Sequence, residues 1–187
     1  TTFPVIEMEF HPTANMVDFL LAPARISPEV AAKAEQIAKN IASALSIVDN
    51  LAVEFFLLPD GTLWVNEVAP RPHNSGHHTI EANETSQYQQ QLRAILGMKL
   101  GSTTTKKPAV MLNLVGEVGY TGQAKYLGFE AVKLLPETFI HLYNKKNTKP
   151  FRKMGHATIV DDNILKAKQK AKAAPAEPAK EAVAATK

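Results

Sequence analysis

The sequence predicts an α+β fold in which antiparallel strands pack against helices. Apolar residues alternate at the start of the chain, helix start signals occur at Ser27 and Ser86, and an Asp-Gly pair at 60–61 separates two apolar runs. The 187 residues are 45% hydrophobic and 21% charged, which supplies enough apolar side chains for at least one packed core. This composition excludes disorder throughout the chain.

Composition also excludes several kinds of chemistry. The chain contains no cysteine, so disulfides, zinc–thiolate sites, iron–sulfur clusters and thiol nucleophiles are ruled out, and a reducing, cytoplasmic location is expected. No apolar run reaches the roughly 18–20 residues of a membrane span, and no secretory leader opens the sequence. We therefore predict no membrane partner.

Positive charge is concentrated in residues 166–187, where six Lys and two Glu give a balance of +4, against +3 for the whole chain. This segment is rich in Ala and contains no aromatic residue. It cannot bury enough apolar area to offset the entropy of ordering, so we predict a flexible Lys/Ala-rich tail that forms helix only transiently, before Pro175. Because it lacks interleaved aromatics and carries acids of its own, no nucleic-acid partner is predicted.

Two strands and a helix are predicted in the first 46 residues. Residues 3–10 have the period-two alternation of a half-buried strand, and residues 17–21 form a second apolar run. Ser27-Pro28-Glu29 combines an N-cap, a proline at the first helical position and a first-turn acid. The helix over 28–46 is expected to pack on a sheet through one apolar face. That face consists of Val30, Ile37, Ile41 and Leu45.

Asp60-Gly61 predicts a β-hairpin between the two apolar runs of LAVEFFLLPDGTLWVNEVAP. If these two residues form the whole turn, cross-strand partners have residue numbers that sum to 121. This register pairs Leu57 with Trp64, close to the turn. It also pairs Glu54 with Glu67, farther along the two strands.

Carboxylates that face each other directly across two strands repel, so something should compensate for this pair. A raised pKa on one acid is one solution, and a bound cation is another. Oxygen-only ligands on rigid strands suit Mg²⁺ that is held jointly with phosphate oxygens. The alternative is a longer loop, with Glu54 and Glu67 as solvated surface residues.

A second helix is predicted from the capping box of Ser86 and Gln89, and it ends at Gly97. Further strands are expected at 109–115, 139–143 and 156–160, whereas 116–136 is ambiguous. The change in pattern after residue 101 divides the chain into three parts. These are a first domain over 1–101, a small β-rich domain over 102–165, and the tail over 166–187.

The loop that follows the hairpin, NEVAPRPHNSGHH, concentrates polar side chains where function is commonly located. Arg71 offers a planar fork for phosphate or carboxylate, and His73 can exchange a proton near neutral pH. A zinc site formed by His73, His77 and His78 with Glu67 is an alternative, although this spacing matches no usual ligand pattern.

A second basic cluster precedes the last predicted strand. Its charge lies at a strand end, where it can meet an anionic ligand held by the first domain beside a metal–nucleotide. The alternative is an ordinary solvated loop. The cluster consists of Lys145, Lys146, Lys149, Arg152 and Lys153.

Three stretches of the sequence resemble 5-(carboxyamino)imidazole ribonucleotide synthase, an ATP-grasp ligase of de novo purine biosynthesis. They are the hairpin with its loop and second helix, AVMLNLVGE, and LYNKKNTKPFRKMGHATI. The resemblance covers about residues 3–162, and NEVAPRPHNSGHHT with RKMGH makes it specific. It implies that 1–101 are the second half of an ATP-grasp domain, an antiparallel sheet with packed helices, and that a small β-rich C-terminal domain follows.

The resemblance implies that ATP and bicarbonate form carboxyphosphate, which carboxylates 5-aminoimidazole ribonucleotide (AIR) and releases ADP and phosphate. It implies Mg²⁺, with Mn²⁺ as an alternative ion, and a homodimer. It assigns Glu54 and Glu67 to the metal and Asn66 with Glu67 to the nucleotide. It assigns Arg71 to steadying carboxyphosphate and His73 to proton transfer or positioning.

The same resemblance places Asn74 near the reacting centre and assigns Lys145 and Arg152 to the phosphate of the ribonucleotide. Whether His11 contacts nucleotide stays open. The family's first ATP-grasp half and its phosphate-covering loop are absent, so this segment is expected to bind ATP weakly by itself. A non-catalytic module for dimerisation or ligand sensing, and a zinc hydrolase built on the histidine loop, are the alternative functions.

Overall fold

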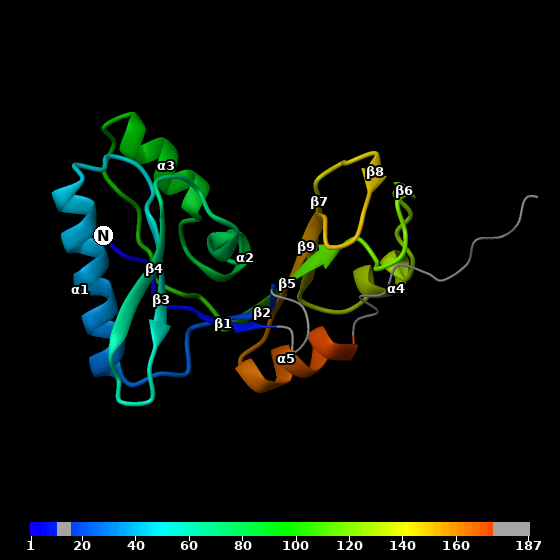
Figure 1. Cartoon of the computed structure of the whole chain (residues 1–187), viewed down its shortest axis with the longest axis horizontal. Helices are drawn as coiled ribbons and strands as arrows, with labels where there is room; N and C mark the ends of the chain where they lie inside the picture. The colour runs from blue at the N-terminus through cyan, green and yellow to red at the C-terminus, as the bar shows by residue number, and fades with distance from the viewer. Residues whose placement is uncertain (11–15, 174–187) are drawn as a thin grey trace, which may run out of the picture.

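The α+β fold is confirmed in a computed structural model that describes residues 1–10 and 16–173. His11 lies outside the described residues. A five-stranded antiparallel sheet has the order β1-β2-β5-β9-β7, and two smaller sheets pair β3 with β4 and β6 with β8. Figure 1 shows the β3–β4 hairpin with α1 and α3 on one side of the molecule, and the larger sheet with α5 on the other.

The elements are β1 (Glu7–Phe10), β2 (Val17–Ala22), α1 (Pro28–Ala44), β3 (Ala52–Leu57), β4 (Leu63–Ala69), η1 (Asn74–Gly76), α2 (Thr79–Ala82), α3 (Gln87–Ile95), β5 (Ala109–Val115), β6 (Gly122–Gln123), α4 (Phe129–Lys133), β7 (Thr138–Leu142), β8 (Asn147–Thr148), β9 (Lys153–Val160) and α5 (Ile164–Ala173). The strands predicted at 109–115, 139–143 and 156–160 correspond to β5, β7 and β9. The ambiguous segment 116–136 contains β6 and α4.

The main core lies between the five-stranded sheet and α5. Strands β2, β5 and β9 direct alternate apolar side chains toward the helix, as the period of two requires. Burial of these side chains supplies the hydrophobic stabilisation of this part of the chain. The buried members are Leu21, Val110, Leu112, Ala157, Ile159, Ala167 and Ala171.

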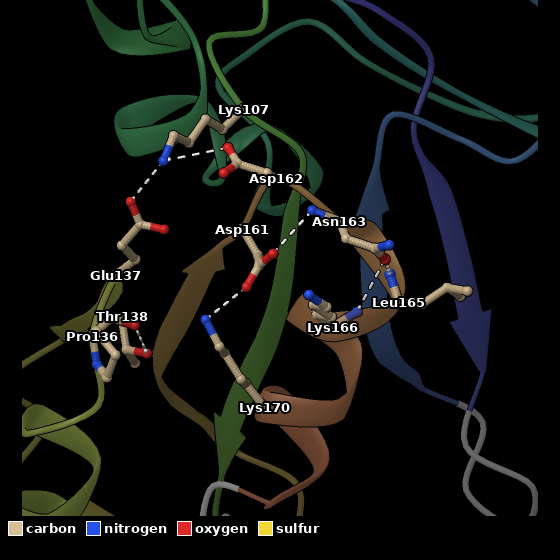
Figure 2. A network of polar contacts seen from close by, with 10 residues as sticks. All are labelled: Lys107, Pro136, Glu137, Thr138, Asp161, Asp162, Asn163, Leu165, Lys166 and Lys170. Carbon is tan, nitrogen blue, oxygen red and sulfur yellow. Dashed lines mark hydrogen bonds and ion pairs between the residues drawn. The ribbon is translucent and has the colours of Figure 1, made fainter.

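Helix α5 corrects the prediction of a flexible tail from residue 166. Ala167 and Ala171, one turn apart, are 0% and 2% exposed against the sheet. Small side chains let the helix backbone approach the strands closely, so Ala-rich sequence packs here without large apolar residues. Lys170 also pairs with Asp161 at 2.7 Å, as Figure 2 shows. The predicted tail beyond residue 173 lies outside the described residues.

The link between β7 and the segment before β5 is polar. Lys107 contacts Glu137 at 2.8 Å and Asp162 at 3.4 Å, and Figure 2 shows both contacts at the Lys107 ammonium. All three side chains are solvent-exposed, so these ion pairs contribute little to stability.

Helix α1 begins as predicted, with Ser27 accepting a hydrogen bond from the Val30 backbone N–H and Pro28 in the first turn. The helix ends at Ala44, two residues earlier than predicted, and packs beside β3. Its fully buried residue is Ala34, whereas Leu45 is 58% exposed. Leu45 was expected on the packed face, but it is the C-cap, where the chain leaves the helix.

The hairpin turn contains three residues rather than two. The Leu58 backbone N–H donates to the Thr62 carbonyl, and Gly61 adopts a positive φ of 83°, as a three-residue loop with glycine in the left-handed region requires. The predicted pairing of Leu57 with Trp64 is therefore wrong, because Leu57 pairs with Leu63.

The predicted pairing of Glu54 with Glu67 is nevertheless confirmed. The register shifts between Glu54 and Phe55, whose partners are Glu67 and Val65, so Asn66 is an extra residue in β4. This β-bulge cancels the one-residue offset introduced by the longer turn. Glu54 and Glu67 thus face each other because the longer turn and the bulge at Asn66 shift the register in opposite directions.

Strands from both sides of the predicted boundary near residue 101 share one sheet, because β2 pairs with β5. The division into domains over 1–101 and 102–165 stays a prediction. No helix in the described part of the chain is long and apolar enough to cross a membrane.

Candidate active site

The loop after β4 is fixed by the side chain of Gln87, the first residue of α3. Its Oε1 accepts the His73 backbone N–H, and its Nε2 donates to the His73 carbonyl, each at 2.9 Å. Gln87 is 5% exposed, so these bonds replace water for a buried stretch of backbone. The predicted capping box of Ser86 and Gln89 holds the start of α3, which places Gln87 under the loop.

Gly76 lies directly against this glutamine. A Cβ atom built on Gly76 would be 2.5 Å from Gln87 Oε1 and 2.8 Å from its Cδ. Residue 76 must therefore be glycine, because the Gln87 side chain lies too close to leave room for a Cβ atom.

We expect Gly76→Ala to lower the free energy of unfolding by about 1–3 kcal/mol, because the new methyl group displaces the Gln87 side chain. Denaturant unfolding measures this loss. The same substitution in a Gln87→Ala background is expected to cost little further, because the clashing atoms are absent. An equal loss in both backgrounds would contradict the proposed clash.

His73 faces the predicted metal acids. Its Nε2 lies 3.8 Å from Glu54 Oε1, while Nδ1 accepts the Ser75 backbone N–H and contacts Ser75 Oγ at 2.9 Å. Because Nδ1 is an acceptor, the proton of the neutral ring sits on Nε2, toward Glu54. Burial lowers the pKa of His73, and the charges of Glu54 and Glu67 partly oppose that shift.

The two acids fit a divalent cation by their chemistry. Glu54 and Glu67 are direct cross-strand partners, so their side chains leave the same face of the hairpin. Glu54 is partly buried, with 20% of its side chain exposed, whereas Glu67 is exposed. Two carboxylates with room for phosphate oxygens are a donor set that suits Mg²⁺.

Glu54 borders a groove of about 980 Å³. Glu54, Asn66, Arg71 and His73 line its polar end, and α1 with the first residues of the chain lines its apolar part. Arg71 is exposed and donates to the carbonyl of Pro72 at 3.1 Å. Its guanidinium therefore stays at the surface of the site, where it can meet an anion.

The structure adds Lys153, which the sequence singled out only as one member of a basic cluster. Its ammonium donates to Asn74 Oδ1 at 3.2 Å and thereby connects β9 with the loop after β4. Burial lowers the pKa of Lys153, and the nearby Glu54 raises it. The side chains that lie together in the site are thus those of Glu54, Glu67, His73, Asn74 and Lys153.

The predicted phosphate-binding residues lie at the edge of this group. Lys145 donates to the Lys153 carbonyl at 2.6 Å and lines a second, more open cavity of about 630 Å³. Arg152 donates to the Asn147 carbonyl at 2.9 Å and is exposed. Both are close in sequence to Lys153, but they bind backbone carbonyls rather than the loop after β4.

The alternative zinc site is contradicted. His78 is 4% exposed, and its Nδ1 contacts the Ser75 carbonyl, whereas His77 Nδ1 contacts Gln87 Nε2 and Tyr88 Oη. These histidines therefore have separate protein partners. Within residues 1–10 and 16–173, no group of three or more His, Asp or Glu side chains is arranged to hold a metal ion.

Behind the loop, three histidine rings from different elements form a stack. His156 of β9 lies 4.7 Å from the His77 ring and 4.6 Å from the His141 ring, measured between centroids. His141 Nε2 contacts Glu81 at 2.7 Å. Burial lowers the pKa of His77 to about 4 and that of His156 to about 3. Both rings are therefore neutral at pH 7.

The stack predicts that stability falls as pH decreases from 7 to 5. In this range the unfolded histidines take up protons while the buried rings do not, so the free energy of unfolding should decrease by about 2–4 kcal/mol for the two rings. Thermal unfolding at both pH values measures the change, and His156→Gln should reduce it. Equal stability at pH 7 and 5 would contradict the burial of neutral rings.

Two family models match this chain. A model of the ATP-grasp domain matches residues 1–88, and a model of the phosphoribosylaminoimidazole carboxylase C-terminal domain matches residues 109–170. The chain thus contains part of an ATP-grasp domain. Among curated relatives, the N5-carboxyaminoimidazole ribonucleotide synthase of Bacillus subtilis is 42% identical over 160 residues, which cover 86% of this chain and 40% of that protein.

Solved structures show the same likeness. The N5-carboxyaminoimidazole ribonucleotide synthetase of Thermotoga maritima is 45% identical with a TM-score of 0.85, and the match covers 92% of this chain and 46% of that one. The synthase of Aspergillus clavatus, in complex with ADP and 5-aminoimidazole ribonucleotide, is 33% identical with a TM-score of 0.79, over 90% of this chain and 45% of that one. The chain belongs to the N5-carboxyaminoimidazole ribonucleotide synthase family and spans less than half the length of these relatives.

Proposed function

We propose that the complete enzyme containing this segment uses ATP and bicarbonate to carboxylate AIR. The single observation that supports this most strongly is the closeness of Glu54, Glu67 and Lys153 to His73, with Asn74 hydrogen-bonded to Lys153. Acids suited to a metal–nucleotide, beside groups suited to a small anion, are what an ATP-dependent carboxylation requires. The family of the chain supports the same reaction.

The reaction has two steps. A bicarbonate oxygen attacks the γ-phosphorus of ATP, the bond to the β-phosphate oxygen breaks, and ADP leaves carboxyphosphate behind. The exocyclic amine of AIR then bonds to the carboxyl carbon, phosphate leaves, and the amine loses a proton. The product is 5-(carboxyamino)imidazole ribonucleotide.

In this proposal Glu54 and Glu67 hold Mg²⁺, or Mn²⁺ in its place, and Asn66 with Glu67 contacts the nucleotide. The ion supplies positive charge that offsets the charge of the phosphates. Asn66 occupies the bulge beside Glu67, so both side chains are presented by the same kink of β4. The remaining chemistry belongs to the loop.

Arg71 steadies the carboxyphosphate through its planar guanidinium. His73 carries its proton on Nε2 toward Glu54, which suits it to hold or transfer a proton at the reacting centre, and Asn74 lies near the same centre. Lys145 and Arg152 bind the phosphate of the ribonucleotide. The homodimer and the cytoplasmic location stay predictions.

The test is formation of ADP by the complete enzyme with AIR and bicarbonate supplied together or separately. We expect ADP formation to require both compounds and to yield the carboxylated ribonucleotide. Binding of AIR without ADP formation would favour the alternative of a non-catalytic module. ADP formation that ignores AIR would refute the proposed substrate.

A further inference from the structure

The side-chain amide of Asn74 is held at both of its ends. Its Oδ1 accepts from Lys153 Nζ at 3.2 Å, and its Nδ2 donates to Asn113 Oδ1 at 2.9 Å. We propose that Lys153 and Asn113 are positioning residues that fix the direction of the Asn74 amide in the site. This inference rests on the proposed function, in which Asn74 lies near the reacting centre.

The chain of contacts has only one consistent direction. The ammonium of Lys153 can only donate hydrogen bonds, so it faces the oxygen of Asn74. The amide NH₂ of Asn74 must then point to Asn113, which receives it with its own oxygen. If the Asn74 amide were reversed, its NH₂ would face the ammonium, and both groups would be donors. The charge of Lys153 therefore fixes the orientation of two neutral side-chain amides, those of Asn74 and Asn113.

The location of Asn113 argues against a role in packing alone. Asn113 is 8% exposed in β5, a strand whose sequence AVMLNLV is otherwise apolar, and it lies opposite His156 of β9. Its Nδ2 has no hydrogen-bond partner among the described residues. A buried amide group with an unmet donor is destabilising. An apolar residue at this position would avoid the cost of burying an unpaired donor. We therefore attribute the asparagine to its contact with the loop.

The three residues come from separate elements. Asn74 begins η1 after β4, Asn113 lies in β5, and Lys153 begins β9, whose neighbour in the sheet is β5. The orientation of the loop amide is thus set by the five-stranded sheet, while Gln87 sets the loop backbone from α3. A small change in either support shifts the reacting geometry, and shifts of about 1 Å can cost roughly 100-fold in rate.

The experiment is a double-mutant cycle in the complete enzyme, measured as AIR- and bicarbonate-dependent ADP formation. We expect Lys153→Met and Asn113→Leu each to lower kcat by about 10- to 100-fold, with a smaller change in the KM for ATP. In an Asn74→Ala background neither change should lower kcat further, because both act through Asn74. Lys153→Arg and Asn113→Asp keep the donor and the acceptor and should recover part of the rate.

Lys133→Met is the matched control, because Lys133 pairs with Glu130 on α4 and should leave kcat unchanged. Losses that persist in full in the Asn74→Ala background would overturn the inference while leaving the proposed function intact. If the unaltered enzyme forms no ADP in response to AIR and bicarbonate, it is the proposed function that fails. The contact is then tested by thermal unfolding, where additive shifts for Asn74→Ala and Asn113→Leu would overturn the inference as well.

Discussion

Glu67→Gln in the complete enzyme is expected to lower AIR- and bicarbonate-dependent ADP formation by about 1,000-fold. The substitution keeps the size of the side chain but removes one of the two negative charges that face each other across β3 and β4. In the proposed function Glu67 holds the cation that offsets the phosphate charge, and loss of such an electrostatic contribution in the transition state has effects of this order. Steady-state kinetics at saturating Mg²⁺ measure the loss.

Stability should move in the opposite direction. Opposed like charges are destabilising in the absence of a cation, so Glu67→Gln is expected to keep or slightly raise the unfolding temperature without metal. This separates a lost metal ligand from a damaged fold. Glu130→Gln, on the exposed end of α4, serves as the control and should change neither property. Normal turnover of Glu67→Gln would refute the metal role.

Gln87→Leu is expected to lower the free energy of unfolding by about 2–5 kcal/mol and to reduce turnover of the complete enzyme by at least about 100-fold. Leucine fills a similar volume but leaves the backbone N–H and carbonyl of His73 without their partners, and each such group costs about 1–3 kcal/mol. The loop then no longer holds His73 and Asn74 in place, which accounts for the lost turnover.

Two variants sharpen this expectation. Gln87→Glu keeps the acceptor for the His73 N–H but loses the NH₂ donor, so an intermediate loss is expected. Gln36→Leu, on α1, removes a glutamine that contacts Asn40 and should have little effect. Equal stability of Gln87→Leu and the unaltered protein would show that the loop does not depend on this side chain.

The sequence singles out the residues of the loop, but not the side chain that supports the loop. Arg71, His73 and Asn74 stand out because polar residues cluster directly after a strand. The only notable feature of Gln87 in the sequence is that it lies within the capping box of α3, and a glutamine at a helix start is common. Its contacts with the loop arise only when α3 packs under residues 73–77.

The hairpin illustrates how a correct pairing can follow from an incomplete premise. The predicted two-residue turn is wrong, yet Glu54 and Glu67 face each other because the bulge at Asn66 restores the register. A bulge leaves no mark in the apolar alternation that is strong enough to predict it. It depends on how the second strand bends over the rest of the fold.

By itself the sequence determined the fold class, the helix starts at Ser27 and Ser86, and the acids and loop residues of the candidate site, because these depend on local spacing and side-chain chemistry. Only the tertiary structure decided that Lys153 and Asn113 meet at Asn74 and that Ala167 and Ala171 hold α5 on the sheet. The physical reason is the distance along the chain. Contacts between residues separated by 39 or 79 positions leave no periodic signal, and they form only when strands from distant segments align in one sheet.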